Sequence, residues 1–213
     1  MKFFRGGGYN ITGDPVWLAA FAAGALPPRG EVLDAGIGTG GAALCLLQHS
    51  PDLQITGIDV SEQMLAECAA NAKLNGRDIK LVRGDITAWK TNRTFDAVIT
   101  NPPYFKGTAR NDGTLHHNAD LCGWTRACLK RVKPRGYFYC IADAAAAAEI
   151  ISALAAGRAG DITIVPLFGR PAKTGQVAER ALISARLGAR GGTKIYAPMN
   201  MNDDGVLRDA DLI

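Results

Sequence analysis

Two kinds of hydrophobic pattern alternate along the chain from about residue 30 onward. Short runs rich in Val, Ile and Leu, typical of buried strands, are followed by longer stretches with apolar residues at helical spacing. The pattern predicts strands at residues 31–36, 54–60, 79–85, 95–100, 137–143, 161–168 and 179–188. It predicts helices at residues 15–25, 40–50, 61–76 and 144–157, and a helix and turn within 120–136. Ser61 is the expected N-cap of the helix that ends at Gly76.

The order of these elements predicts an α/β fold. Strands separated by helices form right-handed β-α-β units, so we expect a Rossmann-like, seven-stranded, mostly parallel sheet with helices on both faces. The last two strands are joined by a loop without a helix, so they are expected to pair as a hairpin with one antiparallel strand at the sheet edge. No repeat or linker divides the chain, and we expect residues 1–213 to form a single domain with a weakly periodic C-terminal tail at 191–213.

The composition of the 213 residues, 47% hydrophobic and 21% charged, supports a sizeable core. No apolar run approaches the roughly 18 residues that a membrane helix needs, and the start MKFFRGGGYN lacks the apolar segment of a secretory signal. These features argue against a membrane-spanning or exported protein, and we expect a cytoplasmic one.

The five cysteines and three histidines lack the spacing of disulfide frameworks and metal sites. No C-x-x-C pair occurs, and most cysteines fall within predicted helices or strands. We therefore expect reduced cysteines that pack in the core and no bound metal. His116 and His117 lie in a polar stretch and are expected at the surface, whereas Trp124, at helical spacing, is expected in the core.

The net charge of +4 permits an anionic partner without requiring one. Basic residues are frequent in the second half of the chain: Lys106, Arg110, Arg126, Lys130, Arg131, Lys133, Arg135, Arg170, Lys173, Arg180, Arg186, Arg190 and Lys194. Most of them are expected to be solvated, and those near strand ends are expected to form a rim that faces phosphate groups.

A glycine-rich turn follows the first predicted strand and opens a helix. In VLDAGIGTGG, Gly36, Gly38 and Gly41 satisfy the spacing G-x-G-x-x-G, and Asp59 ends the next strand. Such glycines let the backbone approach a ligand closely, and the acidic residue accepts hydrogen bonds from ribose hydroxyls. The spacing therefore indicates a nucleotide-binding turn, and Val60, beside Asp59, is a further expected contact.

Acidic residues at successive strand ends indicate which ligand is bound. Asp34, two residues before the first glycine, would repel a pyrophosphate but favours a ligand with an ammonium group. S-adenosylmethionine has an amino group, a sulfonium and no phosphate. Asp85 ends the third strand, where it can accept from the adenine amine while the Ile86 backbone N–H reaches a ring nitrogen. Because ligands bind at this edge of an open parallel sheet, S-adenosylmethionine is the expected cofactor.

The segment NPPYF, residues 101–105, follows the fourth predicted strand. Pro102 and Pro103 lack backbone donors, and Pro102 holds Asn101 extended, which makes a stiff corner rich in acceptors. The Asn101 side-chain oxygen and the Pro102 carbonyl can accept from both N–H bonds of a planar amine. Such acceptors would stabilise the positive charge that develops on the nitrogen during methyl transfer.

The residues after this corner are expected to contact the substrate. Tyr104 can stack on a flat ring, as aromatic side chains do with flipped bases. The predicted catalytic residues are Asn101, Pro102 and Tyr104, and the predicted substrate-binding residues are Pro103, Tyr104, Phe105 and Lys106. For Phe105, packing against the sheet is an equal alternative. Asn101 is also expected to border the cofactor.

Together, DAGIGTG, Asp59, the GDI at residues 84–86 and NPPY resemble class I S-adenosylmethionine-dependent methyltransferases of the amino-methylating branch. This branch includes adenine-N6, cytosine-N4 and glutamine-N5 enzymes, and the resemblance covers nearly the whole chain. It implies the class I methyltransferase fold, S-adenosylmethionine as cofactor and methyl transfer to a planar amino group.

Residues 6–20, together with NPPYF, are similar to the bacterial tRNA-valine adenine-N6-methyltransferase family. This resemblance implies that residues 1–30 cover the cofactor, with Tyr9, Thr12 and Asp14 on the cofactor side, and that the acceptor is adenine N6 in tRNA. An N-cap role for Thr12 or Asp14 before the first helix is an equal alternative.

Other acceptors and another class of protein stay open. A protein glutamine, another RNA or DNA amino group, or a small-molecule amine would use the same corner. An NAD-dependent oxidoreductase would explain the glycines and Asp59 but not NPPYF. A basic rim favours tRNA over the other acceptors.

Overall fold

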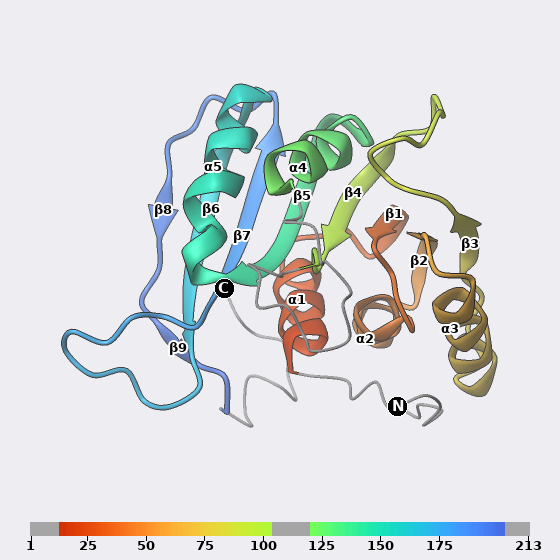
Figure 1. Ribbon diagram of the computed structural model, residues 1–213, viewed down its shortest axis with the longest axis horizontal. Helices are drawn as coiled ribbons and strands as arrows, with labels where there is room; N and C mark the ends of the chain where they lie inside the picture. Colours follow the sequence, from red (N-terminus) through yellow and green to blue (C-terminus); the bar gives the residue numbers. More distant parts are fainter. Residues whose placement is uncertain (1–12, 104–119, 203–213) are drawn as a thin grey trace, which may run out of the picture.

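A nine-stranded sheet forms the centre of the computed structural model, which describes residues 13–103 and 120–202 (Figure 1). Its strands are β1 (Arg29–Ala35), β2 (Asp52–Asp59), β3 (Lys80–Arg83), β4 (Phe95–Thr100), β5 (Val132–Asp143), β6 (Ala159–Phe168), β7 (Arg180–Leu187), β8 (Lys194–Ile195) and β9 (Met199–Asn200). Neighbouring strands follow the order β3-β2-β1-β4-β5-β7-β6-β8, and β9 also pairs with β6.

The predicted fold class is confirmed, because the sheet is mostly parallel and has one antiparallel strand, although it has nine strands and not the expected seven. β7 runs antiparallel to both β5 and β6, whereas the other described pairings are parallel. The expected hairpin of β6 and β7 is present. Within it, β7 occupies the inner place next to β5, because the parallel crossover from β5 to β6 leaves a gap of one strand that β7 fills.

Helices cover both faces of the sheet, as expected (Figure 1). The helices are α1 (Asp14–Ala23), α2 (Gly41–His49), α3 (Glu62–Leu74), α4 (Leu121–Leu129) and α5 (Ala147–Ala156), and a short 3₁₀ turn, η1 (Ala144–Ala146), precedes α5. Alternate strand residues face opposite layers: Val32 packs with α1, α2 and α3, whereas Leu33 packs with α4 and α5. All five cysteines are free and four are buried, which confirms their packing role.

Helix ends follow local sequence signals in part. Ser61 caps α3, and its hydroxyl accepts from the Met64 N–H at 3.2 Å, as predicted. α1 differs, because Gly13 is its N-cap and no side chain bonds there. Asp14 is therefore not a capping residue, and Thr12 lies outside the described residues. None of the helices in 13–103 and 120–202 is long and apolar enough to cross a membrane.

Part of the expected C-terminal tail belongs to the sheet. Lys194 pairs with Thr163 of β6, and Met199 pairs with Leu167. The Trp17 indole N–H donates to the carbonyl of Met201 at 3.2 Å, which ties this segment to α1. Strands of two residues are too short to produce a periodic pattern, so the sequence did not predict them.

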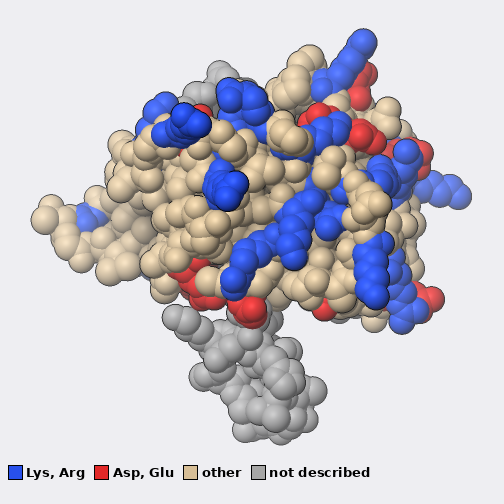
Figure 2. Space-filling view, turned by 90° about the horizontal axis from the view of Figure 1, so that it is seen from above, with Lys and Arg blue, Asp and Glu red and all other residues tan. Residues whose placement is uncertain are grey.

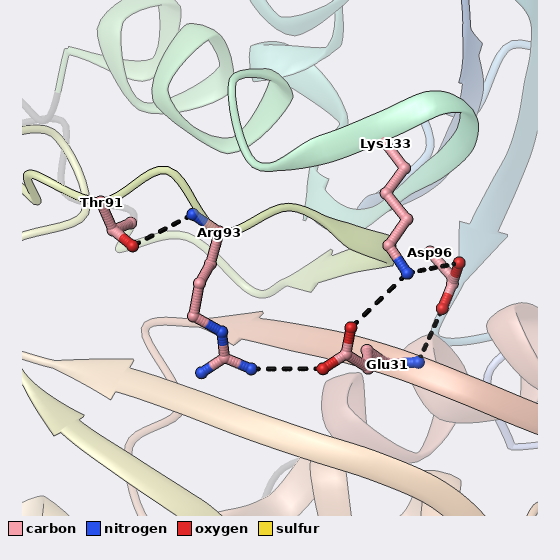
Figure 3. Close-up of polar contacts among 5 residues, drawn as sticks. All are labelled: Glu31, Thr91, Arg93, Asp96 and Lys133. Atoms are coloured by element: carbon pink, nitrogen blue, oxygen red, sulfur yellow. Dashed lines mark hydrogen bonds and ion pairs between the residues drawn. The ribbon is translucent and has the colours of Figure 1, made fainter.

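Charged side chains connect β1, β4 and β5 near their amino ends (Figure 3). Asp96 accepts from the Glu31 backbone N–H at 2.8 Å and from the Lys133 ammonium at 3.0 Å, and Arg93 reaches Glu31 at 3.4 Å. Partial burial opposes ionisation of Asp96, but these hydrogen bonds lower its pKa. The side chains are 37–45% exposed, so each ion pair contributes only about 0–1 kcal/mol.

Candidate functional site

A cavity of about 620 Å³ lies at the edge of the sheet where the parallel strands end. The ends of β1, β2, β3, β4 and β5 line it, together with the starts of α1 and β7. The antiparallel strand β7 begins at the same edge, so its first residue also reaches the cavity. Ligands of open α/β sheets bind at this edge, and the cavity is therefore the candidate site.

The glycine-rich turn forms one wall of the cavity. The backbone N–H groups of Gly36 and Ile37 donate to the carbonyl of Ile58 at 2.9 and 3.1 Å, which holds the turn against β2. Gly36 and Gly38 line the cavity with φ of 75° and 53°, values that favour glycine. A Cβ built on Gly38 would meet nothing within 4 Å, so the turn is open to a ligand at this point.

Asp59 connects the turn to the end of β2. One carboxylate oxygen accepts from the Gly38 N–H at 2.9 Å, and the other accepts from the Ser61 N–H at 2.9 Å. Each oxygen keeps a second acceptor position, so the carboxylate can also accept from ligand hydroxyls. Val60 beside it lines the cavity and is 65% exposed, and it offers an apolar surface suited to a flat heterocycle.

Asp85 and Ile86 line the same cavity at the end of β3. The Thr87 backbone N–H and hydroxyl both donate to Asp85 Oδ1, at 2.8 and 2.7 Å. Within residues 13–103 and 120–202, no hydrogen bond engages Oδ2, which can therefore accept from a ligand amine. This geometry fits the adenine contact that the sequence predicts.

Asp34 is buried and does not line the cavity. Its carboxyl group accepts from the backbone N–H of Ala43 in the first turn of α2, and its Oδ2 has no hydrogen-bond partner among the described residues. Burial raises the pKa of Asp34 to about 7, and the nearby charge of Asp59 adds to the shift. The expected contact with a ligand ammonium group therefore stays a prediction.

Asn101, Pro102 and Pro103 line the cavity beside the glycine turn. They follow β4, which lies next to β1 in the sheet, so the strand order brings the NPPYF segment close to the glycine-rich turn. Several other predicted site residues lie outside the described residues: Tyr9, Thr12, Tyr104, Phe105 and Lys106. His116 and His117, which are expected at the surface, also lie outside them. Their roles stay predictions.

Trp124 of α4 is a lining residue that sequence reasoning assigned to the core alone. The side chain packs against the core and also lines the cavity. Its indole N–H donates to the Thr100 hydroxyl at 3.1 Å, and Thr100 in turn donates to the Ala35 carbonyl at 2.7 Å. A Cβ on Gly36 would lie 3.3 Å from the Trp124 ring, so glycine lets the ring lie directly on the turn.

Asp14 and Arg180 form an ion pair on the cavity wall. The Arg180 Nε lies 3.1 Å from Asp14 Oδ2, and the two side chains are 32% and 9% exposed. The residues are 166 positions apart in the chain, so no local signal could have paired them. Asp14 thus reaches the predicted cofactor side, with Arg180 as a partner that the sequence did not indicate.

Most of the charged residues in the described lining of the cavity are acidic. Asp14, Asp59, Asp85 and Asp143 contribute carboxylates, and Arg180 is the basic lining residue within the described ranges. Such a cavity suits a ligand with sulfonium and ammonium charges. Figure 2 shows Lys and Arg gathered on the opposite edge of the sheet, where the parallel strands begin.

One group of possible metal ligands occurs in the described parts of the chain. Asp120, Cys122 and Glu149 bring their ligand atoms within 4.8 Å of one another. Asp120 caps α4 by accepting from the Gly123 N–H at 2.7 Å, and Glu149 accepts from the Cys122 N–H at 3.1 Å. These hydrogen bonds explain the cluster without an ion.

A family model described as the methyltransferase small domain matches residues 16–148. A ribosomal RNA small subunit methyltransferase C of Shewanella amazonensis is 37% identical over 79 residues. A release factor glutamine methyltransferase of Deinococcus radiodurans is 37% identical over 93 residues. A tRNA1(Val) (adenine(37)-N6)-methyltransferase of Vibrio campbellii is 32% identical over 126 residues. These matches cover 37%, 43% and 54% of this chain, and 23%, 33% and 52% of the relatives.

Solved structures share the fold at low identity. A predicted O-methyltransferase from Agrobacterium tumefaciens has a TM-score of 0.73 at 21% identity, and the match covers 92% of this chain and 96% of that one. The 16S rRNA N2 G1207 methyltransferase of T. thermophilus, in complex with AdoMet and guanosine, has a TM-score of 0.59 at 19% identity, covering 86% and 45%. These likenesses support the Rossmann-like class I fold.

Proposed function

Because the chain belongs to the methyltransferase small domain family, we propose that it is an S-adenosylmethionine-dependent N-methyltransferase that acts on adenine N6 in tRNA. The observation on which this rests is that Asn101 and Pro102 line the same cavity as Asp59 and Asp85. The proposed acceptor corner and the proposed cofactor contacts therefore face one cavity.

The cofactor supplies a methyl group bound to a sulfonium, and the residues of this chain bind and orient the reactants. Asp59 is suited to the ribose hydroxyls, Asp85 to the adenine amine, and exposed Val60 to the flat ring. The acidic lining favours a cationic cofactor.

The Asn101 side-chain oxygen and the Pro102 carbonyl are proposed to accept hydrogen bonds from the two N–H groups of the target amine. An amine conjugated to a ring has a delocalised lone pair and is a poor nucleophile. Two acceptors fix its orientation and stabilise the charge that develops on nitrogen, so a strongly basic side chain is not required.

Adenine in tRNA is favoured by two observations. The Vibrio relative bears that activity in its name, and its match covers 52% of that relative, a larger share than the matches to the Shewanella amazonensis and Deinococcus relatives cover of theirs. The chain also has a positive net charge of +4, which suits a polyanion. A tRNA substrate is in keeping with the cytoplasmic location that the sequence predicts.

A protein glutamine is the second candidate acceptor. The release factor glutamine methyltransferase of Deinococcus is as similar in identity as the rRNA enzyme, at 37%. A glutamine side-chain amide is planar, so the same pair of acceptors would suit it.

Incubation with a radiolabelled methyl donor and separate tRNA, rRNA, DNA and release-factor fractions tests the proposal. The expected result is label in tRNA that is recovered as N6-methyladenosine after digestion, and strongly reduced label with Asn101→Ala. Label recovered as N5-methylglutamine would establish the second candidate instead. Tight calorimetric binding of NAD with none of S-adenosylhomocysteine would contradict both.

A further inference from the structure

A second cavity, of about 340 Å³, lies on the α1 face of the sheet. It spans the middle of β5, the amino half of β6 and the end of β7, and β8 borders it. No residue of its lining also lines the cofactor cavity, so the two are separate in the described parts of the chain.

The cavity exists because α1 is too short to cover this face. The helix has 10 residues, about 15 Å, whereas β5 has 12 residues and extends about 40 Å. Nearer the carboxyl ends, Ile141 and Leu182 pack beneath apolar neighbours. Nearer the amino ends, the face lies beyond the end of α1, where Phe21 and Gly24 form one wall of the cavity.

Strand pairing places a polar row across the floor of this cavity. Tyr139 of β5 lies opposite Ser184 of β7, and Ser184 lies opposite Thr163 of β6. Thr163 is in turn the partner of Lys194 in β8. Paired residues share a face of the sheet, so these four side chains project to the same side.

Aromatic and basic groups surround the row. The rings of Tyr137 and Tyr139 are stacked with centroids 5.8 Å apart, and the Arg186 guanidinium lies 5.3 Å from the Tyr137 ring. Arg186 Nε donates to the Arg135 carbonyl at 2.9 Å, which leaves its terminal nitrogens as donors for a ligand. Neither Arg186 nor Lys194 has an ion pair among the described residues, and they outnumber the single lining carboxylate, Asp161.

The Tyr139 hydroxyl is a buried group without a partner. Tyr139 is 1% exposed, and its oxygen makes no hydrogen bond with the described residues. A buried hydroxyl without a hydrogen-bond partner is unfavourable, and Tyr139 lines the cavity. A ligand with a polar edge would therefore satisfy a group that the protein leaves unsatisfied.

We propose that this cavity binds a nucleotide. Arg186 and Lys194 hold the phosphate, and the base packs with the tyrosines, including Tyr196, which is 38% exposed. The Tyr139 hydroxyl bonds the polar edge of the base. The nucleotide is either free or one residue of an RNA strand, and only the second source rests on the proposed tRNA substrate.

The test measures binding to two probes in saturating S-adenosylhomocysteine, which keeps AMP out of the cofactor cavity. AMP is titrated by calorimetry, and a labelled single-stranded RNA decamer by fluorescence anisotropy. Three variants are compared: Tyr139→Phe, which removes only the unpaired hydroxyl, Lys194→Ala, and the control Lys80→Ala, an exposed lysine on β3. Melting temperatures establish that each variant is folded.

Tyr139→Phe and Lys194→Ala are each expected to weaken binding about fivefold or more, whereas Lys80→Ala leaves it unchanged. For RNA, Lys194→Ala should also reduce the slope of log K against log salt by about one. An effect on AMP identifies a free nucleotide, and an effect on RNA alone identifies a strand residue. The proposal is overturned if wild type binds neither probe, or if all three variants bind like wild type.

Methyl transfer to tRNA is measured in parallel. AMP binding with no RNA methylation would refute the proposed function alone. RNA methylation together with nucleotide binding that Tyr139 and Lys194 do not affect would refute the second site alone.

Discussion

The backbone N–H of Gly38 donates a hydrogen bond of 2.9 Å to Oδ2 of Asp59, across the 21 positions that separate them in the chain. The bond joins the glycine-rich turn to the end of β2. Because Oδ1 binds the Ser61 N–H, one carboxylate holds two loops in place. Asp59 therefore has a structural role in addition to the ligand contact that the sequence predicts.

This double role leads to a prediction for Asp59→Ala. Loss of the carboxylate should weaken S-adenosylhomocysteine binding by about 10-fold or more, because ligand acceptors are lost and the Gly38 and Ser61 N–H groups lose their partner. Calorimetry measures the affinity. Asp59→Asn keeps one acceptor oxygen and should lose less affinity than Asp59→Ala. Unaltered affinity in the alanine variant would contradict the ribose assignment.

Asn101→Ala should separate chemistry from cofactor binding. The variant removes a proposed acceptor that acts on the developing charge, so methyl transfer should fall by about 10² to 10³. S-adenosylhomocysteine affinity should stay within about threefold, because Asp59 and Asp85 are intact. Single-turnover kinetics and calorimetry measure the two effects. Equal losses in both would count against the acceptor role.

Burial of Asp34 predicts a dependence of stability on pH. Its pKa rises from 3.8 to about 7 in the folded protein, so between these values the folded state binds a proton that the unfolded state has released. Stability from this group therefore falls as pH rises towards 7 and then levels off. Between pH 6 and 8 the free energy of unfolding should drop by about 1–2 kcal/mol.

Urea unfolding of the protein without cofactor, over this pH range, measures the effect. Asp34→Asn cannot ionise and should lack this part of the pH dependence. Identical profiles for the two proteins would show that Asp34 is already ionised in the folded state.

Gly40 offers a matched test of packing beneath the turn. Its φ is 88°, and an added Cβ would lie 2.7 Å from the Cys68 sulfur, whereas Gly76 has φ of 62° and open space. Gly76→Ala should lower stability by about 1–2 kcal/mol from the left-handed backbone alone. Gly40→Ala should lower it by about 2–4 kcal/mol, because the clash adds to the strain. If chemical denaturation shows the same loss of stability for Gly40→Ala and Gly76→Ala, the contact with Cys68 does not add to the strain.

The ion pair of Asp14 and Arg180, which joins α1 to β7, should contribute to the free energy of unfolding. Arg180→Met leaves the buried Asp14 carboxylate without this cation, and we expect a loss of about 1–3 kcal/mol. The double variant Asp14→Asn/Arg180→Met should recover part of the stability that Arg180→Met loses. The control Arg83→Met breaks an exposed pair with Glu62 and should cost under about 1 kcal/mol. No recovery in the double variant would show that the two residues act independently.

Local patterns were sufficient for most elements. Ser61 as an N-cap and the hairpin of β6 and β7 could be predicted because capping and turn chemistry depend on neighbours in the chain. The strand of two residues at Lys194–Ile195 could not, since its pairing with β6 is decided by the sheet that already exists.

By itself, the sequence determined the alternation of strands and helices and the motifs at the strand ends, because side-chain periodicity and glycine-rich turns are local properties. Parallel order then brings Gly38, Asp59, Asp85 and Asn101 to one edge. Only the tertiary structure decided that Asp34 is buried and is not a lining residue of the cavity, that Trp124 lines it, and that Arg180 pairs with Asp14. Burial and long-range pairing depend on how separate elements pack, and no stretch of sequence contains that information alone.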